Sequence, residues 1–190
     1  MQQQRVVADA RHRARLEQKA LGDLLRRDQV RVQELQRDAL IEAADLSWFA
    51  GDRIGPDRLA LWIALRLSGV QDDTAALARV GWAVRRLTGG PRPEVDLAAF
   101  VDRRDPENLA NEAESFADRA GGWLDVMAQA ADLHPISRAC MGFHLWSLAG
   151  LGQHGDRMEA AVTAARIAAS EVRGAVFAPV AMGGAVGLRA

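Results

Sequence analysis

Apolar side chains recur at intervals of three, four or seven residues between Leu21 and Leu46. This spacing places them on one face of a helix, and only Asp28 interrupts the series. A long helix with so narrow an apolar seam usually packs against another helix, in its own chain or in a partner. The sequence therefore predicts a helical arm over residues 1–50 that carries an interaction seam. The seam residues are Leu21, Leu25, Val32 and Leu35, and the stripe continues through Ala39, Ala43 and Leu46.

Glycine and proline divide the next part of the chain. Pro56 suits the first turn of a helix, which the apolar pattern extends to about Leu67. Asp72 or Asp73 is a suitable N-cap for a second helix that ends near Leu87. Residues 51–88 are therefore expected to form a helical hairpin, and the Gly-Gly-Pro-Arg-Pro run at 89–93 predicts a hinge.

Residues 94–173 have the pattern of a helical core. Asp105-Pro106 resembles a helix start, and the apolar phase that follows passes unbroken through Gly121-Gly122, so one bent helix is expected there. His134-Pro135 ends that helix, and the segment after it is apolar on nearly all sides, which is typical of a central buried helix. The expected helices cover about 94–103, 105–133, 136–151 and 157–173, the last capped by Asp156.

The apolar, glycine-rich tail over residues 174–190 either packs as an extended strap or marks an end where a further domain continued. Across the whole chain 49% of residues are hydrophobic, tyrosine is absent, and alanine and arginine, both strong helix formers, are abundant. We expect an all-α fold, an irregular bundle of about six to seven helices with a long N-terminal helical arm.

Charge and cysteine content exclude several classes of protein. The 24 basic and 25 acidic side chains leave a net charge of −1, without the overall basic excess of a dedicated nucleic-acid binder. The single cysteine excludes an internal disulfide and a multi-cysteine zinc site, and no metal or cofactor is expected. No secretory signal and no membrane-spanning stretch are apparent, so we expect a cytoplasmic protein.

A nucleic-acid surface is one alternative that the sequence leaves open. The predicted hairpin over 56–87 has the dimensions of a helix-turn-helix, and its second helix combines a tryptophan with basic residues. That helix starts with Asp72-Asp73, however, and two carboxylates there would repel a phosphate backbone, so DNA binding is possible but not favoured. The candidate contacts are Arg79, Trp82, Arg85 and Arg86.

A small pocket is a second alternative. Cys140 and His144 lie four residues apart and share a helix face with thiolate or metal-ligand potential, and Trp146 is close by. In so apolar a segment a free cysteine more often behaves as a small hydrophobe. Glu42 and Asp45 form a further acid/base candidate, although carboxylates on a charged helix are usually solvated or paired with arginine.

Three segments resemble an uncharacterised bacterial family in which a helical region, similar to the N-terminal domain of Fic proteins, precedes a C-terminal winged helix-turn-helix. They are ALIEAADLSWFAGDRI at 39–54, HPISRA with FHLW between 134 and 146, and FAPVAMGG at 177–184. The chain ends at Ala190, where the family continues into its DNA-binding module, and the Fic catalytic motif is missing. The resemblance therefore implies a regulatory or assembly role and assigns no catalysis.

These observations favour a non-enzymatic helical interaction or regulatory module that associates with a protein partner or with itself, through the arm or the tail. The alternatives are a DNA-associated transcriptional regulator component that uses the 56–87 hairpin, and a small helical enzyme or ligand binder with a pocket near Cys140 and His144.

Overall fold

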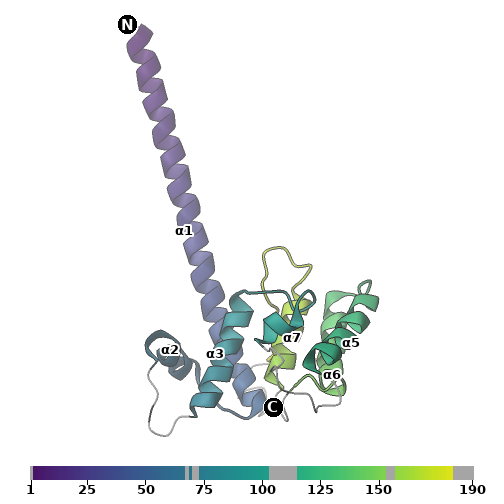
Figure 1. Cartoon of the computed structure of the whole chain (residues 1–190). Coiled ribbons are helices and arrows are strands. Elements are labelled where there is room, and N and C mark those ends of the chain that lie inside the picture. The colour runs from purple at the N-terminus through teal and green to yellow at the C-terminus, as the bar shows by residue number, and fades with distance from the viewer. Residues whose placement is uncertain (1, 67–68, 70–72, 103–114, 153–156, 182–190) are drawn as a thin grey trace. The chain divides into compact units, whose positions relative to one another are not determined.

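The computed structural model describes residues 2–66, 69, 73–102, 115–152 and 157–181, with the side chains of the first helix described from Lys19 onward, Ala20 excepted. These residues form seven α-helices and no strand, which confirms the predicted all-α fold (Figure 1). The helices are α1 (Gln2–Ala50), α2 (Pro56–Leu65), α3 (Thr74–Thr88), α4 (Leu97–Val101), α5 (Phe116–Gln129), α6 (Pro135–Leu148) and α7 (Met158–Ala168).

The chain divides into two compact units, Met1–Asp38 and Ala39–Ala190. The boundary lies inside α1 and not at its end, where the sequence placed it. Ala39, Ala43 and Leu46, on the last turns of α1, are buried in the core of the second unit. Only the C-terminal part of the apolar stripe of α1 therefore belongs to the core, whereas the part before residue 39 does not.

Local capping chemistry explains where the short helices begin. The Asp73 carboxylate accepts hydrogen bonds from the N–H groups of Ala75 and Ala76 at 2.9 and 3.1 Å, and it caps α3 as predicted. Proline occupies the first turn of α2 and of α6. At the start of α5, Ser115 and Asp118 form a capping box. The expected caps Asp105 and Asp156 lie outside the described residues.

Helix α7 is the central helix of the second unit, packed between α3 and α6 (Figure 1). Nine of its eleven residues are buried, and most of them are alanines. Their small side chains allow neighbouring helices to approach closely. The prediction that the apolar segment 136–151 would be the central buried helix is therefore wrong: Leu148 on α6 is 81% exposed. Apolar residues surround α6 on nearly all sides, but the fold covers only some of those sides.

Helix α5 runs without a break through Gly121 and Gly122, as the preserved apolar phase predicted. It packs on α6 through two tryptophans, whose rings meet edge to face with centroids 5.9 Å apart. The indole N–H of Trp123 donates to the carbonyl of Gly142 at 3.2 Å. Trp146, the second of the pair, is therefore part of the core.

The described part of the tail, residues 174–181, packs against the second unit as an extended strap. The N–H of Ala178 donates to the carbonyl of Ala165 on α7 at 2.9 Å. The N–H groups of Val180 and Ala181 both donate to Oε1 of Glu42, at 2.6 and 2.9 Å. Residues 174–181 therefore form the extended strap that was one of the two predictions for the tail. Residues 182–190 lie outside the described part of the chain.

Candidate functional site

The interaction seam of α1 is exposed in the first unit. Leu21 is 58% exposed, Val32 is 53% exposed, and Leu25 is exposed to a similar degree. Leu35 is half-buried. The only ion pair described along this stretch joins Arg26 to Asp23 on the same helix, at 3.2 Å. The seam therefore meets the requirement that its side chains be available to a partner.

The residues beside the seam carry little charge of one sign. In a heptad repeat, Leu25 and Val32 occupy the a positions of the seam, and Leu21, Asp28 and Leu35 occupy the d positions. The residues that flank such a seam are those at the e and g positions. The e positions hold Gly22, Gln29 and Gln36, and the g positions hold Leu24, Arg31 and Asp38. An identical helix laid on this seam would meet no continuous row of like charges.

The basic set predicted on α3 does not form one open surface, because most of its members contact other parts of the chain. Arg79 Nη2 lies 2.7 Å from Oδ1 of Asp52 in the loop after α1. Arg86 donates to the carbonyl of Ala99 at 3.0 Å and forms an ion pair with the carboxylate of Asp102.

Of the remaining two members of the α3 set, the half-buried Trp82 packs edge-on against Phe100, with ring centroids 6.0 Å apart. Arg85 is exposed. Structural contacts therefore account for three of the four residues proposed for nucleic acid, since a neighbouring carboxylate or ring meets each of them.

The predicted pocket residues on α6 do not converge. Cys140 and His144 are exposed on the outer face of the helix, one turn apart. Trp146 is 1% exposed and faces α5. A thiol or metal site that uses all three side chains is thus excluded by the phase of the helix, since residues 144 and 146 point about 200° apart.

Glu42 is buried, and its carboxylate holds the strap, as described above. Burial raises the pKa of Glu42 above its ordinary value of 4.5, and the negative charge of Asp45 adds to the rise. The two backbone hydrogen bonds act in the opposite direction and are outweighed. Glu42 thus acts as an acceptor for the tail, and the structure shows no cavity role for the Glu42–Asp45 pair among the described residues.

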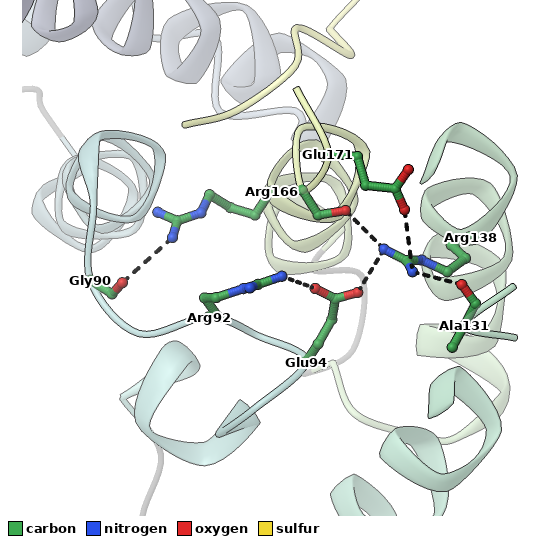
Figure 2. A network of polar contacts seen from close by, with 8 residues as sticks. Gly90, Arg92, Glu94, Ala131, Arg138, Arg166 and Glu171 are labelled. Atoms are coloured by element: carbon green, nitrogen blue, oxygen red, sulfur yellow. Dashed lines mark hydrogen bonds and ion pairs between the residues drawn. The ribbon is translucent and has the colours of Figure 1, made fainter. Parts of the chain in front are cut away.

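A polar network around the buried Arg138 and the half-buried Arg166 joins elements that are far apart in the sequence, and the sequence analysis did not predict it (Figure 2). Arg138, the only charged side chain on α6, donates to the carbonyl of Ala131 at 3.1 Å and to the hydroxyl of Ser170 at 2.8 Å. It also lies 3.2 Å from a carboxylate oxygen of Glu94. A lone arginine in an otherwise apolar helix was the available signal, since such a charge needs several partners when it is buried.

Arg166 on α7 fastens the loop that the sequence predicted to be a hinge at 89–93. Its guanidinium donates to the carbonyls of Arg86 and Gly89, at 2.5 and 2.8 Å. It also approaches the carbonyl of Gly90, the contact drawn in Figure 2. Burial lowers the pKa of Arg166, and the charges of Arg86 and Arg92 add to this effect. The contacts hold the C-terminal end of α3 against α7.

One pocket of about 230 Å³ opens beside Trp82. It is lined by Ala78, Arg79, Trp82, Val101, Met158 and Glu159. Its lining combines one guanidinium and one carboxylate with apolar walls, so it has no strong preference for either charge.

Within the described part of the chain, no group of histidine, cysteine or acidic side chains is arranged to hold a metal ion. No helix there offers a stretch that is both long and apolar enough to cross a membrane. In comparisons with known proteins, no family model, no curated protein and no solved structure matches the chain.

Proposed function

We propose that the protein is a non-enzymatic helical interaction module that associates with a second copy of itself through the seam of α1. The observation that carries the proposal is the change in burial along one stripe of one helix. Ala39, Ala43 and Leu46 are covered by the protein's own core, whereas Leu21 and Val32, on the same face, are more than half exposed. Covering such residues removes apolar surface from water, which is favourable at about 25 cal/mol per Å².

A second copy is the occupant that the flanking residues favour. Charged e and g positions determine which helices pair, and a row of like charges there prevents self-pairing. In this seam all three e positions are uncharged, and Arg31 is followed by Asp38 at the next g position. Two copies can therefore approach without a systematic charge penalty.

Asp28 interrupts the seam in either orientation of the pair. In a parallel pair in register, the two Asp28 carboxylates would face each other between the helices, where like charges in contact are strongly unfavourable. An antiparallel pair that overlaps over residues 21–35 also brings the two carboxylates close together, because Asp28 is the middle residue of that stretch. In both arrangements Asp28 weakens the association, so the proposal specifies a second copy and no orientation.

The resemblance to a bacterial regulator family supports an assembly role for such a module. Pairing through α1 would bring two copies of the second unit into one complex, as is common for transcriptional regulators that act as dimers. The cytoplasm is the compartment that this proposal assigns.

Two matched valine variants test the proposal in the full-length chain. Val32 lies on the seam, whereas Val30 lies two residues away on a different face and is 52% exposed, almost the same fraction. We expect Val32→Asp to abolish self-association in sedimentation experiments over a range of concentrations, because it places a second charge in the seam. Val30→Asp introduces the same side chain outside the seam and should associate as the unmodified protein does.

A third variant tests whether removing the charge from the seam strengthens self-association. Asp28→Leu completes the apolar seam and should tighten self-association by about tenfold or more, since a buried leucine contributes roughly 1.5–3 kcal/mol. The proposal is wrong if the unmodified chain and Asp28→Leu both remain monomeric at high micromolar concentration, or if the two valine variants behave alike.

A further inference from the structure

Aromatic rings and basic groups meet on the surface of the second unit where the end of α1 lies beside α6 and the start of α7. Phe49 and Phe143 have ring centroids 6.3 Å apart, and the guanidinium of Arg157 lies over the Phe49 ring at 5.6 Å. The imidazole of His144 lies 5.5 Å from the Phe143 ring. Trp48 and Arg53 form a second aromatic–basic pair at the same end of α1, with the Arg53 guanidinium 6.0 Å from the Trp48 ring. We call these four residues, together with that pair, the aromatic–basic cluster.

The loop after α1 fixes the position of Arg53. The hydroxyl of Ser47, which is fully buried, accepts a hydrogen bond from the N–H of Ile54 at 2.8 Å. The N–H of Arg53 donates to the Ser47 carbonyl at 3.3 Å. Arg53 has a φ of +54°, in the left-handed region that disfavours residues other than glycine, and its guanidinium lies 6.0 Å from the Trp48 ring. Strained backbone that is held in this way is often found at binding sites.

No carboxylate among the described residues pairs with either guanidinium group of the cluster, that of Arg53 or that of Arg157. Asp52, the residue before Arg53, uses its carboxylate to bind Arg79 at 2.7 Å. Of the acidic residues near Arg157 in the sequence, Glu159 lines the pocket beside Trp82, and Asp156 lies outside the described residues.

The cluster also offers ring surface to solvent. Phe49 is 38% exposed, His144 is exposed, and Phe143 and Trp48 are half-buried. An apolar partner would bury the two arginines without counter-ions, which is unfavourable, and a cationic ligand would be repelled. A ligand with both a flat aromatic face and a negative charge satisfies both kinds of group.

We propose that the aromatic–basic cluster binds a nucleotide unit, a base with its phosphate, either free or within a single-stranded nucleic acid. The base stacks on the exposed side of the Arg157 guanidinium, which itself lies over the Phe49 ring, because aromatic rings and arginine planes are the usual stacking surfaces for unpaired bases. Arg53 contacts the phosphate. This inference uses no residue of the α1 seam and is independent of self-association.

Fluorescence anisotropy with a labelled oligothymidylate, titrated with the full-length protein over a salt series, tests the proposal. We expect binding at low salt that weakens as salt rises. Phe49→Leu keeps an apolar side chain but removes the ring, and it should weaken binding roughly fivefold to a hundredfold, the range expected when one stacked base is lost. Arg157→Gln should weaken binding similarly, since Arg157 is the other half of the stack.

Arg53→Gly is a variant in which a change of affinity can be separated from a loss of folding, because glycine suits the positive φ of this position. Glycine adopts a positive φ readily, so the variant should unfold at the same temperature as the unmodified protein or a higher one. If Arg53 contacts one phosphate, this variant should reduce the slope of log affinity against log salt concentration by about 0.7.

Arg173→Gln is the matched control, because Arg173 is an exposed arginine beyond the C-terminal end of α7, outside the cluster. It should leave affinity and salt slope unchanged. A competing thymidine monophosphate that displaces the probe would identify free nucleotides as ligands, and competition by unlabelled strand alone would identify nucleic acid. The proposal is overturned if the probe does not bind at low salt, if Phe49→Leu binds normally, or if inorganic polyphosphate competes as well as the strand does.

Discussion

Glu42 illustrates how one side chain on the first helix determines the course of the last described residues. Its carboxylate is the shared acceptor for two backbone N–H groups of the strap, those of Val180 and Ala181. Without that acceptor, these N–H groups would lose their partner unless the strap moved away from the core. The raised pKa shows that burial of the charge outweighs the stabilisation that the two hydrogen bonds provide.

The effect of pH on Glu42 follows from the direction of this shift. Because the pKa is higher in the folded state than its ordinary value of 4.5, the folded state binds the proton more tightly than the unfolded state does. The contribution of Glu42 to stability is therefore most favourable below the unfolded pKa and decreases as pH rises through the folded pKa. We expect the free energy of unfolding of the unmodified protein, measured relative to that of Glu42→Gln, to decrease as pH is raised from about 4.5 towards neutrality.

Two substitutions of Glu42 distinguish its role as a hydrogen-bond acceptor from the effect of its negative charge. Glu42→Ala removes the acceptor and should lower the free energy of unfolding by about 1–3 kcal/mol at neutral pH. Glu42→Gln retains an oxygen that can accept both N–H groups and should be less destabilising than Glu42→Ala. Denaturant unfolding of both variants at neutral pH gives the comparison, and equal losses would show that the charge and not the acceptor holds the strap.

At the scale of single helices, the glycines of α3 and α5 have opposite roles. A Cβ atom built on Gly81 of α3 would lie 2.5 Å from the Trp62 ring of α2, so the absence of a side chain permits the close contact of these two helices. A Cβ on Gly122 of α5 would have no atom within 4 Å beyond its own helix. Glycine is therefore required at the first position and only lowers helix stability at the second.

Alanine substitutions test this difference between the two helices. Gly122→Ala should raise the free energy of unfolding by about 0.5–1 kcal/mol, because alanine restricts the unfolded chain and favours the helix. Gly81→Ala has the same propensity gain, yet it should lower stability because the indole ring of Trp62 must move. Thermal or denaturant unfolding of the two variants would contradict this reading if both changed stability in the same direction.

At the scale of the whole molecule, the buried apolar residues among the side chains that the structure describes all belong to the second unit. The core begins at Ala39 and includes residues from each of α2 to α7. Arg138 and Arg166 add polar connections between the loop around residues 89–94 and the helices α6 and α7. The second unit thus has its own apolar core and its own polar contacts between elements, as an independently folding domain requires.

A truncated chain tests the independence of this unit. A fragment that starts at Asp38, which can serve as N-cap for the shortened helix, should unfold cooperatively at nearly the same temperature as the full-length protein at low concentration. It should remain monomeric in sedimentation experiments, because the seam has been removed. Loss of the cooperative transition would show that the first 37 residues contribute to folding.

The sequence predicted much of the fold because the relevant signals are local. Pro56, Asp73 and Pro135 mark helix starts through their own backbone chemistry, and the structure places helix starts at or beside each of them. The continuous phase through Gly121 and Gly122 likewise indicated one helix. The nucleic-acid and pocket candidates were less successful, because residue type and spacing do not reveal which partners the fold supplies.

Helix content, the helix starts and the position of the apolar seam follow from properties of neighbouring residues: propensity, capping and a repeat close to 3.6 positions. The burial of α7 in place of α6, the use of Glu42 to hold the strap, and the meeting of Phe49 with Phe143 and Arg157 depend on contacts between distant segments. Local patterns cannot encode such contacts, because an alanine-rich or an apolar helix looks the same in the sequence whichever neighbour packs on it. Only the packed chain shows which charges are neutralised and which rings remain exposed.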